Sequence, residues 1–512
     1  MKKIILISGI ALAFASCQQE TAVKEEIQSF EMTTEIPAGI LTPDKVETSI
    51  GTLEYFDGVP SKETSAYVYD YLDRMRGVDA FMKGIPGASV RGLIVGLAEA
   101  GVNQYNKVGI TKSLLDSKSL LLTANTSTIY VTPYINVGKN GPIVMETPPG
   151  MLGAFNDAWF RYIADIGPFG EDKGKGGKYL ILPPGYEGEV PEGYFIIKSP
   201  TNKVFIFTRT SIANGIDKAV KMLADNLKIY PLAEKDNAKA MELVDISGVD
   251  FNTVHTNDFS FYEHIAEWIN EEHVDMLDDQ TKGLFASIGI EKGKPFAPDE
   301  RMKKILTEAV ALGNAAARSI TYYPRTNMNL AGVEIYPDTK SSWIMAFANK
   351  DVFFTSETGG FNTDALDMFH YSYTAVTPAM AVTIEGAGSD YAISFLDGDK
   401  KPFDGAKEYK LHIPPNVPVN DFWAVTIYDT QTRSLLQTDQ QFPTVGSQTE
   451  GFKQNEDGSF DVFFSPNPTP GKENNWLQTI PGKSFIVILR VYGPLKPWIE
   501  KTWRPGEVLL VE

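Results

Sequence analysis

The sequence predicts an α+β fold: a β-rich N-terminal domain, a helical middle segment and a C-terminal antiparallel β-sandwich resembling a jelly roll. Short β-branched and aromatic runs between Gly and Pro turns dominate residues 120–210. Amphipathic helical patterns follow over 215–319, and strand-like runs return after Trp343. With 512 residues, 43% of them hydrophobic and 22% charged, the chain matches ordinary globular composition and can bury a large core.

The N-terminus reads as a secretory signal that ends at the only cysteine of the chain. Lys2 and Lys3 precede an apolar run over 4–14, and Ala15 and Ser16 stand immediately before Cys17. Phe14-Ala-Ser-Cys17 resembles the bacterial lipobox, so we expect lipidation of Cys17 after removal of residues 1–16. An ordinary signal peptide with an incidental cysteine is the alternative. Residues 17–50 are predicted to form a flexible tether, and a single cysteine excludes disulfides from the folded body.

Residues 51–240 are predicted to form the β-rich domain with helices at its edge. Apolar residues at helical spacing predict one helix over 65–82 and a second over 90–105, with Pro86 lying just beyond the end of the first. Period-two and continuous apolar runs predict strands at the following positions: 128–134, 142–146, 179–182, 194–197 and 203–210.

A helical connecting segment is predicted over 241–330, and the sandwich domain over 331–512. Helical patterns cover 215–225, 259–272 and 298–319, the last beginning near Asp299. Strand-like runs in the C-terminal part cover 391–396, 408–413, 422–428, 460–464 and 484–491. Five or more strands at this spacing favour a sandwich.

Motifs in both halves resemble a bacterial two-domain family. On the N-terminal side they are Asn125-Thr-Ser-Thr-Ile-Tyr130, Gly141-Pro-Ile-Val144, Tyr179-Leu-Ile-Leu-Pro-Pro-Gly-Tyr186 and Arg209; on the C-terminal side they are Tyr409-Lys-Leu-His412, Asp421-Phe-Trp-Ala-Val-Thr-Ile-Tyr-Asp429, Asn475-Trp-Leu477 and Arg490-Val-Tyr-Gly-Pro494. The chain resembles domain of unknown function 1254 followed by domain of unknown function 1214. The resemblance implies a β-rich envelope or secreted protein and no established chemistry. Ser127 stands where the family commonly has Asp.

Composition and motif searches narrow the possible partners. A formal net charge of −18 disfavours binding to phosphate backbones, so no nucleic-acid partner is expected. We expect attachment to a membrane only through the lipid, in the cell envelope, with the leaflet undetermined. Self-association into a homo-oligomer is left open. Zinc-protease, phosphate-loop and calcium-loop patterns each lack an essential residue, so no metal and no cofactor is predicted.

Three residues are candidates for catalysis. His412 is one of five histidines and lies in a family-like strand motif, although a half-buried structural histidine is the alternative. Asp157 and Arg161 are four residues apart and would share a helix face, where they would orient a ligand or form a plain surface ion pair. Arg209 ends an apolar strand, where its guanidinium would bind a carboxylate or pin a turn.

Ligand-binding candidates come from the family-like segments and from the aromatic residues, which make up 11% of the chain. They are Asn125, Tyr130, Arg161, Trp423, Trp476 and Arg490. Aromatic platforms with polar tips suit sugars and other amphipathic ligands, and a sandwich core is the alternative for the tryptophans.

Two hypotheses on function follow. The first is a lipid-anchored envelope protein that binds a small organic or sugar-like ligand in an aromatic-lined pocket. The second is a cofactor-free hydrolase or lyase that acts on such a ligand. A cleft containing Asn125, Tyr130, Arg209 and His412 together would favour the enzyme.

Overall fold

The computed structural model describes residues 31–326, 330, 332–337, 339–356 and 358–511. The chain divides into two compact units, Met1–Tyr69 and Asp70–Glu512, which are described separately. The expected signal peptide and Cys17 lie outside the described residues.

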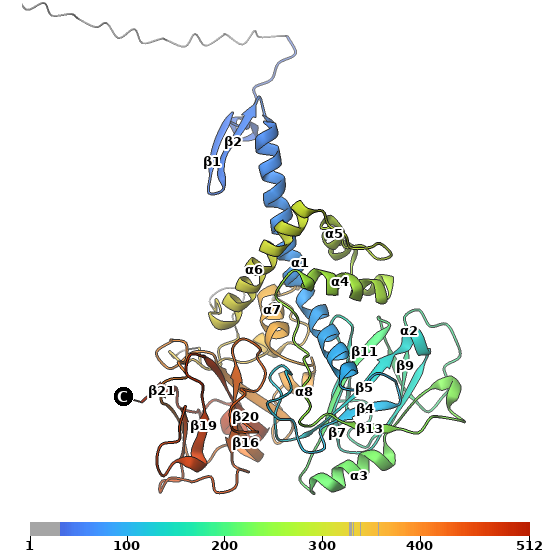
Figure 1. The fold of residues 1–512 in the computed structure, drawn as a ribbon, viewed down its shortest axis with the longest axis vertical. Helices are drawn as coiled ribbons and strands as arrows, with labels where there is room; N and C mark the ends of the chain where they lie inside the picture. Colours follow the sequence, from blue (N-terminus) through green and yellow to red (C-terminus); the bar gives the residue numbers. More distant parts are fainter. Residues whose placement is uncertain (1–30, 327–329, 331, 338, 357, 512) are drawn as a thin grey trace, which may run out of the picture. The chain divides into compact units, whose positions relative to one another are not determined.

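The described part of the first unit contains one small sheet. Its elements are η1 (Ala38–Ile40), β1 (Lys45–Thr48), β2 (Gly51–Phe56) and β3 (Val59–Pro60). The strands pair antiparallel in the order β1-β2-β3 (Figure 1). Residues 45–48, placed in a tether by the sequence prediction, therefore form a strand, because the turn at Gly51 lets them pair with β2. The Thr48 hydroxyl closes this turn by donating to the Gly51 carbonyl at 2.6 Å.

One long helix replaces the two helices predicted around Pro86. Helix α1 (Lys62–Glu99) continues through Pro86, although an internal proline costs a helix about 3 kcal/mol or more. Packing offsets this cost: Ile85 and Val90 are fully buried, and Gly87 lies so close to Trp159 that a Cβ would stand 2.4 Å from its ring. The prediction of a helix end at Pro86 was therefore wrong, as was the extension of the second helix to residue 105.

Two sheets with short helices between their strands form the N-terminal part of the second unit. The six-stranded sheet has the order β13-β4-β5-β11-β7-β8, and the four-stranded sheet has the order β10-β9-β6-β12. Their elements are β4 (Lys107–Ile110), β5 (Ile129–Asn136), α2 (Val137–Asn140), β6 (Ile143–Thr147), β7 (Met151–Asp157), β8 (Tyr162–Ile166), β9 (Gly177–Leu182), β10 (Phe195–Lys198), β11 (Lys203–Thr210), α3 (Ile216–Asn226), β12 (Lys228–Pro231), η2 (Leu232–Glu234) and β13 (Glu242–Asp245). One core joins both sheets, with Ile129, Val131, Ile181 and Ile206 among its members.

The middle of the chain is helical, as predicted for residues 241–330, and further helices lie between residues 348 and 381, which the sequence prediction placed in the sandwich. It contains α4 (Ser260–Glu271), η3 (Val274–Met276), α5 (Asp279–Ser287), α6 (Glu300–Tyr322), η4 (Ala348–Lys350), α7 (Thr363–Ser372) and α8 (Pro378–Ala381). Asp299 caps α6 by accepting a hydrogen bond from the Met302 amide at 2.7 Å, which places the helix start at the predicted residue. These helices share a core with the outer face of the six-stranded sheet and with part of the C-terminal half.

The C-terminal part contains two four-stranded sheets. An antiparallel sheet has the order β14-β20-β16-β17, and a second has the order β19-β18-β15-β21, in which β18 and β19 pair parallel. The elements are β14 (Ser389–Ser394), β15 (Tyr409–Ile413), β16 (Val419–Asp429), β17 (Thr444–Gly446), β18 (Phe460–Ser465), η5 (Glu473–Asn475), β19 (Trp476–Gln478), β20 (Phe485–Pro494), α9 (Lys496–Ile499) and β21 (Val508–Leu510). Leu411, Val425 and Leu489, from both sheets, belong to one buried cluster.

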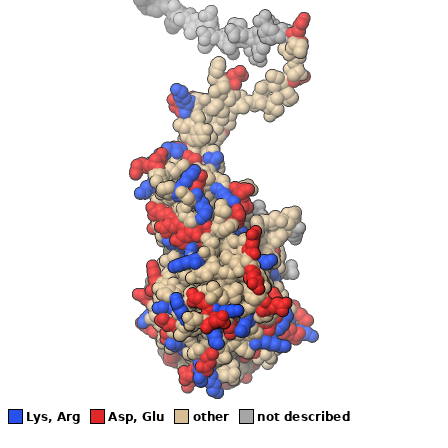
Figure 2. Space-filling model, turned by 90° about the vertical axis from the view of Figure 1, so that its right-hand side faces the viewer, with Lys and Arg blue, Asp and Glu red and all other residues tan. Residues whose placement is uncertain are grey.

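Acidic and basic side chains are interspersed over the face that Figure 2 shows. No helix in the described ranges has both the length and the apolar character needed to span a bilayer.

Candidate functional site

A tyrosine and an arginine lie side by side on the six-stranded sheet. Along β5 and β11, side chains alternate between the two faces of the sheet, so that Ile129 and Val131 enter the core while Tyr130 points to the opposite face. The antiparallel register places Tyr130 directly opposite Arg209. On the other side of β11, Arg209 lies directly opposite Leu152 of β7.

The antiparallel C-terminal sheet repeats this arrangement. Arg490 on β20 lies directly opposite Tyr391 on β14. Its neighbours Leu489 and Val491 point into the core between the two C-terminal sheets, so alternation directs Arg490 to the other face, together with Ile488. Two cross-strand tyrosine–arginine pairs, one from each half of the unit, therefore line a single cavity.

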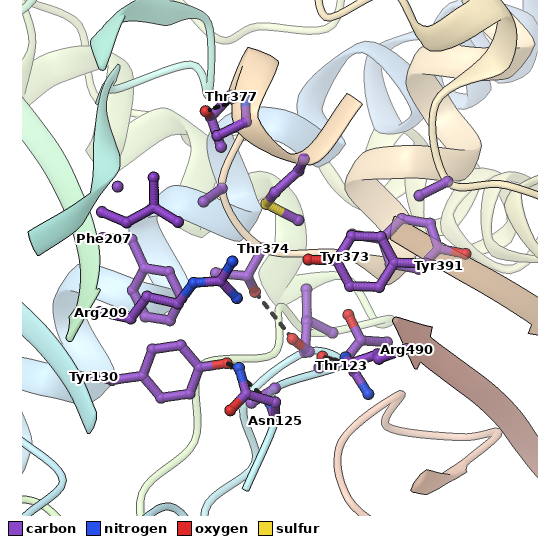
Figure 3. A pocket seen from close by; sticks show the side chains of 18 of the residues that line it. Thr123, Asn125, Tyr130, Phe207, Arg209, Tyr373, Thr374, Thr377, Tyr391 and Arg490 are labelled. Carbon is purple, nitrogen blue, oxygen red and sulfur yellow. Dashed lines mark hydrogen bonds between the residues drawn. The ribbon is translucent and has the colours of Figure 1, made fainter. Parts of the chain in front are cut away.

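The cavity has a volume of about 80 Å³, counted as the space open to the centres of water molecules. Figure 3 shows the guanidinium of Arg209 reaching into it from the N-terminal sheet and Arg490 standing on the other side. The segment between α7 and β14 forms a third wall. The complete lining is Leu122, Thr123, Ala124, Asn125, Tyr130, Leu152, Gly153, Phe207, Thr208, Arg209, Ala346, Tyr373, Thr374, Ala375, Thr377, Ala379, Met380, Tyr391, Ile393, Ile488 and Arg490.

The loop that precedes β5 is held by the C-terminal half through three consecutive carbonyl oxygens. Thr374 Oγ1 donates to the carbonyl of residue 122 at 3.2 Å. Arg490 Nη2 donates to the carbonyl of residue 123 at 2.6 Å. The hydroxyl of Tyr428 donates to the carbonyl of residue 124 at 2.6 Å. These bonds fix the loop immediately before Asn125, and they satisfy backbone acceptors that would otherwise be buried without partners.

Asn125 positions Tyr130. Its backbone N–H and its side-chain amide both donate to the Tyr130 hydroxyl oxygen, at 2.9 and 2.8 Å. The Asn125 Oδ1 in turn accepts from the amides of Ser127 and Thr128 and from Thr128 Oγ1, which fixes the orientation of the side chain. A phenol oxygen has two acceptor positions, and both are used here. The proton of Tyr130 has no acceptor among the described residues and is free to donate to a ligand.

The two arginines each reach across the cavity edge to the opposite half. Arg209 Nη2 donates to Ser389 Oγ on β14 at 3.0 Å, while Arg490 holds the loop at Thr123. Neither guanidinium forms an ion pair with an Asp or Glu of the described ranges. Arg490 is only 4% exposed, and its Nη1 is buried without a hydrogen-bond partner there. The hydroxyl of Tyr373, also 4% exposed, lacks a partner within the same ranges.

Tyr130 and Tyr373 are protonated at neutral pH. Burial raises the pKa of Tyr130 to about 12, against the opposing effects of the hydrogen bond from Asn125 and of the charges on Arg490 and Arg209. Burial also raises the pKa of Tyr373. Both hydroxyls therefore act as hydrogen-bond donors rather than as bases.

Two polar residues of the six-stranded sheet hold the third wall. Asn156 on β7 donates to the carbonyl of Val376 at 2.8 Å and accepts from the amide of Val376 at 3.1 Å. Asp165 on β8 accepts from Thr377 Oγ1 at 2.7 Å, and burial raises its pKa to about 6. Ala375, which lines the cavity, has a φ of +67°, a left-handed conformation that is strained for a residue with a Cβ.

Asp157 and Arg161 lie outside the cavity and do not share a helix. Asp157 ends β7, and a tight turn brings Arg161 back so that its Nε donates to Asp157 Oδ2 at 2.5 Å. Asp157 Oδ1 also accepts from the amides of Trp159 and Arg161. The predicted ion pair forms, between a fully buried Asp157 and a half-exposed Arg161. The predicted helix was wrong, because the carboxylate organises a turn at the end of β7.

His412, Trp423 and Trp476 also lie elsewhere. His412 stands on β15, its side chain 45% exposed, with Nδ1 2.9 Å from Asp461 Oδ1. Trp423 is buried against Phe452 and Phe460, and Trp476 Nε1 donates to the carbonyl of Ser465 at 2.9 Å. None of the three lines the cavity. Of the predicted ligand-binding residues, Asn125, Tyr130 and Arg490 come together with Arg209.

Sequence reasoning missed Tyr373, Tyr391 and the whole segment over 373–380. Tyr391 had a usable signal, since Ser389, Tyr391 and Ile393 alternate with Ala392 in a predicted strand. The wall segment had none, because its conformation depends on contacts with Asn156 and Asp165, more than 200 residues away in the chain. Ser127, in the family Asp position, is half-buried and does not line the cavity.

Within the described ranges, no group of three or more His, Cys, Asp or Glu side chains is arranged to hold a metal ion.

Comparison with known proteins gives two domain matches and a similar fold. Residues 105–231 match the family model described as protein of unknown function (DUF1254). Residues 388–496 match the family model described as protein of unknown function (DUF1214). No curated protein matches the chain. The crystal structure of the VPA0106 protein from Vibrio parahaemolyticus has a TM-score of 0.51 at 18% identity, covering 86% of this chain and 100% of that one. An uncharacterised protein from Burkholderia cenocepacia has a TM-score of 0.38 at 11% identity, covering 88% of this chain and 97% of that one.

The matched domains meet at the cavity. Tyr130 and Arg209 come from the first matched region, and Tyr391 and Arg490 come from the second. The chain therefore carries a DUF1254 match followed by a DUF1214 match, in the order that the sequence motifs predicted.

Proposed function

We propose that this protein binds a small organic anion in the cavity between its two matched domains. The observation that carries the proposal is Arg490: its guanidinium is 4% exposed, has no acidic partner among the described residues and leaves Nη1 without an acceptor. A buried unpaired charge costs several kcal/mol. An anionic ligand would supply the missing counter-charge and acceptor.

The remaining polar groups support the same ligand. Tyr130 and Tyr373 offer hydroxyl protons without acceptors among the described residues, and Arg209 has no acidic partner there and donates to the neutral Ser389 hydroxyl. A carboxylate accepts several such bonds at once, and charge-assisted bonds are about twice as strong as neutral ones. A neutral sugar would leave both guanidinium charges uncompensated. The apolar part of the lining, which includes Leu122, Ile393 and Ile488, suits a hydrocarbon body.

Binding is favoured over hydrolysis or elimination by what lines the cavity. Among the described lining residues there is no Asp, Glu, His, Lys, Cys or Ser. A hydrolase or lyase without a cofactor needs a base or an activated nucleophile within reach of its substrate. Among the described lining residues, hydroxyl groups come from threonines and tyrosines, and burial raises the pKa of Tyr130 and of Tyr373.

Small molecules extracted from the purified protein and identified by mass spectrometry test this function. We expect an organic anion to be released from the wild-type protein and to be absent from Arg490→Gln. Because Arg490 also holds the Thr123 carbonyl, Tyr373→Phe serves as a second variant that removes only an unpartnered hydroxyl. Its anion content should fall without loss of folded protein. Identical extracts from wild type and both variants would contradict the proposal.

We also propose that Cys17 carries a lipid that anchors the protein in the bacterial cell envelope. The proposal is supported by the basic, apolar and small-residue succession before Cys17. Radiolabelled palmitate should label the wild-type protein and not Cys17→Ser, which should move from the membrane to the soluble fraction. Labelling of the variant would contradict the anchor.

For the C-terminal half, we propose a β-sandwich in which the two four-stranded sheets stack face to face. The support is the single buried cluster to which Leu411, Val425 and Leu489 contribute from both sheets.

A further inference from the structure

The charges of the cavity point to a particular class of anion. Arg209 and Arg490 are connected by a short chain of contacts: Arg209 donates to Ser389, Ser389 is 2.9 Å from the Tyr391 hydroxyl, and the Arg490 guanidinium is 5.6 Å from the Tyr391 ring. The two guanidinium groups line the same cavity, and no Asp or Glu of the described ranges pairs with either one. A ligand with one negative charge would neutralise only one of the two positive charges.

The free donors fall into two groups on opposite sides of the cavity. On the C-terminal side are Arg490 Nη1 and the Tyr373 hydroxyl, both buried and without partners among the described residues. On the N-terminal side are Arg209 and the proton of Tyr130, opposite each other on β11 and β5. Apolar side chains, among them Leu122, Ile393 and Ile488, line the same cavity. Each group matches one carboxylate, since an arginine fork and a hydroxyl fill the acceptor positions of a carboxylate.

The volume limits the length of the ligand. The space open to water centres is about 80 Å³, and each molecule of liquid water takes a share of about 30 Å³, so the cavity holds a few water molecules. We therefore expect a ligand with a short chain.

We propose that the natural ligand is a short dicarboxylate, with one carboxylate on Arg490 and Tyr373 and the other on Arg209 and Tyr130. This inference rests on the proposed function, that the cavity binds an organic anion. Inorganic phosphate is disfavoured, because it would not fill the apolar part of the lining.

Calorimetric titration of the folded chain, after removal of bound small molecules, tests the ligand class. Succinate and glutarate are compared with butyrate and valerate, which have the same chain lengths and one carboxylate, and with inorganic phosphate. We expect the better dicarboxylate to bind at least 10-fold more tightly than its matched monocarboxylate. Arg209→Gln should remove that preference while monocarboxylate binding persists. Arg325→Gln, an exposed arginine outside the cavity, is the control and should keep the preference.

The outcomes separate the two proposals. Equal affinity for butyrate and succinate, lost in Arg490→Gln, would overturn the dicarboxylate and leave the anion site standing. Tighter binding of phosphate than of any carboxylate would also overturn the dicarboxylate. If none of the anions bound to the wild-type protein, the proposed function itself would be contradicted.

Discussion

Tyr130 on β5 lies directly opposite Arg209 on β11, and Tyr391 on β14 stands in the same relation to Arg490 on β20. Each pair belongs to a different matched domain, and each arginine also bonds to the other half of the unit. The cavity therefore depends on both domains. Two sheets that alternate strictly between core and cavity faces are enough to bring the four side chains together.

The Tyr130 hydroxyl is expected to affect both folding and binding. Tyr130→Phe leaves the backbone N–H and side-chain amide of Asn125 without their acceptor. Unsatisfied buried donors cost about 1–3 kcal/mol each, so the free energy of unfolding should fall by that order. Urea denaturation measures the loss. Tyr373→Phe is the matched control, since it removes a hydroxyl without a partner in the described ranges and should not lower stability. Equal destabilisation by both changes would argue against the assigned role of Asn125.

Asp165 should make the protein less stable as pH rises from about 4 to 6. Burial raises its pKa to about 6, so the folded state keeps a proton that the unfolded state has already lost. The resulting loss, complete above pH 6, is about 3 kcal/mol. The hydrogen bond from Thr377 opposes this rise in the pKa of Asp165, and the charge of Asp165 in turn raises the pKa of Tyr162. Asp165→Asn should be more stable than wild type at pH 7 and no more stable at pH 4, as measured by urea denaturation. A constant difference across this range would contradict the assignment.

His370 should have the opposite pH dependence. It is packed among Phe160, Phe354 and Phe369, and burial lowers its pKa to about 3. Below pH 6.5 the unfolded state therefore binds a proton that the folded state does not bind. The free energy of unfolding falls as the pH decreases. His370→Phe should change stability by under about 1 kcal/mol at pH 7 and should be about 3 kcal/mol more stable than wild type at pH 4. Thermal unfolding at the two pH values measures this. No gain at pH 4 would show that His370 accepts its proton in the folded protein.

The close contact between α1 and the N-terminal sheet can be tested with an alanine. In Gly87→Ala the new Cβ would stand 2.4 Å from the Trp159 ring, so we expect a loss of about 1–3 kcal/mol. Gly283→Ala in α5 has no atom within 4 Å of its Cβ and should gain up to about 1 kcal/mol from higher helix propensity. Urea midpoints of the two variants measure the effect. A neutral Gly87→Ala would mean that the helix moves away freely at this point.

His412 should have no part in ligand binding. It lies on β15, outside the cavity, and faces Asp461. His412→Ala should therefore leave the affinity for the bound anion within about 2-fold of wild type. A large loss of affinity in His412→Ala would contradict the assignment of the anion site to the cavity.

The sequence predicted most elements because their patterns were local. The strand over 203–210 and the helix starting at Asp299 appear at the predicted residues, since alternation and a capping aspartate act within one turn or strand. The predicted helix end at Pro86 was wrong, because the tertiary packing of Ile85 and Val90 outweighs the local helix-breaking effect of the proline. The helix predicted from the spacing of Asp157 and Arg161 was wrong, because two residues four apart can also close a tight turn.

Only part of the site could be predicted from the sequence. Asn125, Tyr130, Arg209 and Arg490 were found through family-like motifs, and their meeting depends on long-range register that a single sequence does not reveal. The wall formed by Tyr373, Thr377 and their neighbours depends on contacts with distant strands.

A crystal structure of the protein with glutarate tests the central claim most directly. We expect a carboxylate oxygen about 2.7–2.9 Å from Arg490 Nη1, with the second carboxylate toward Arg209. A cavity filled only with water, with glutarate absent or bound elsewhere on the protein, would contradict it.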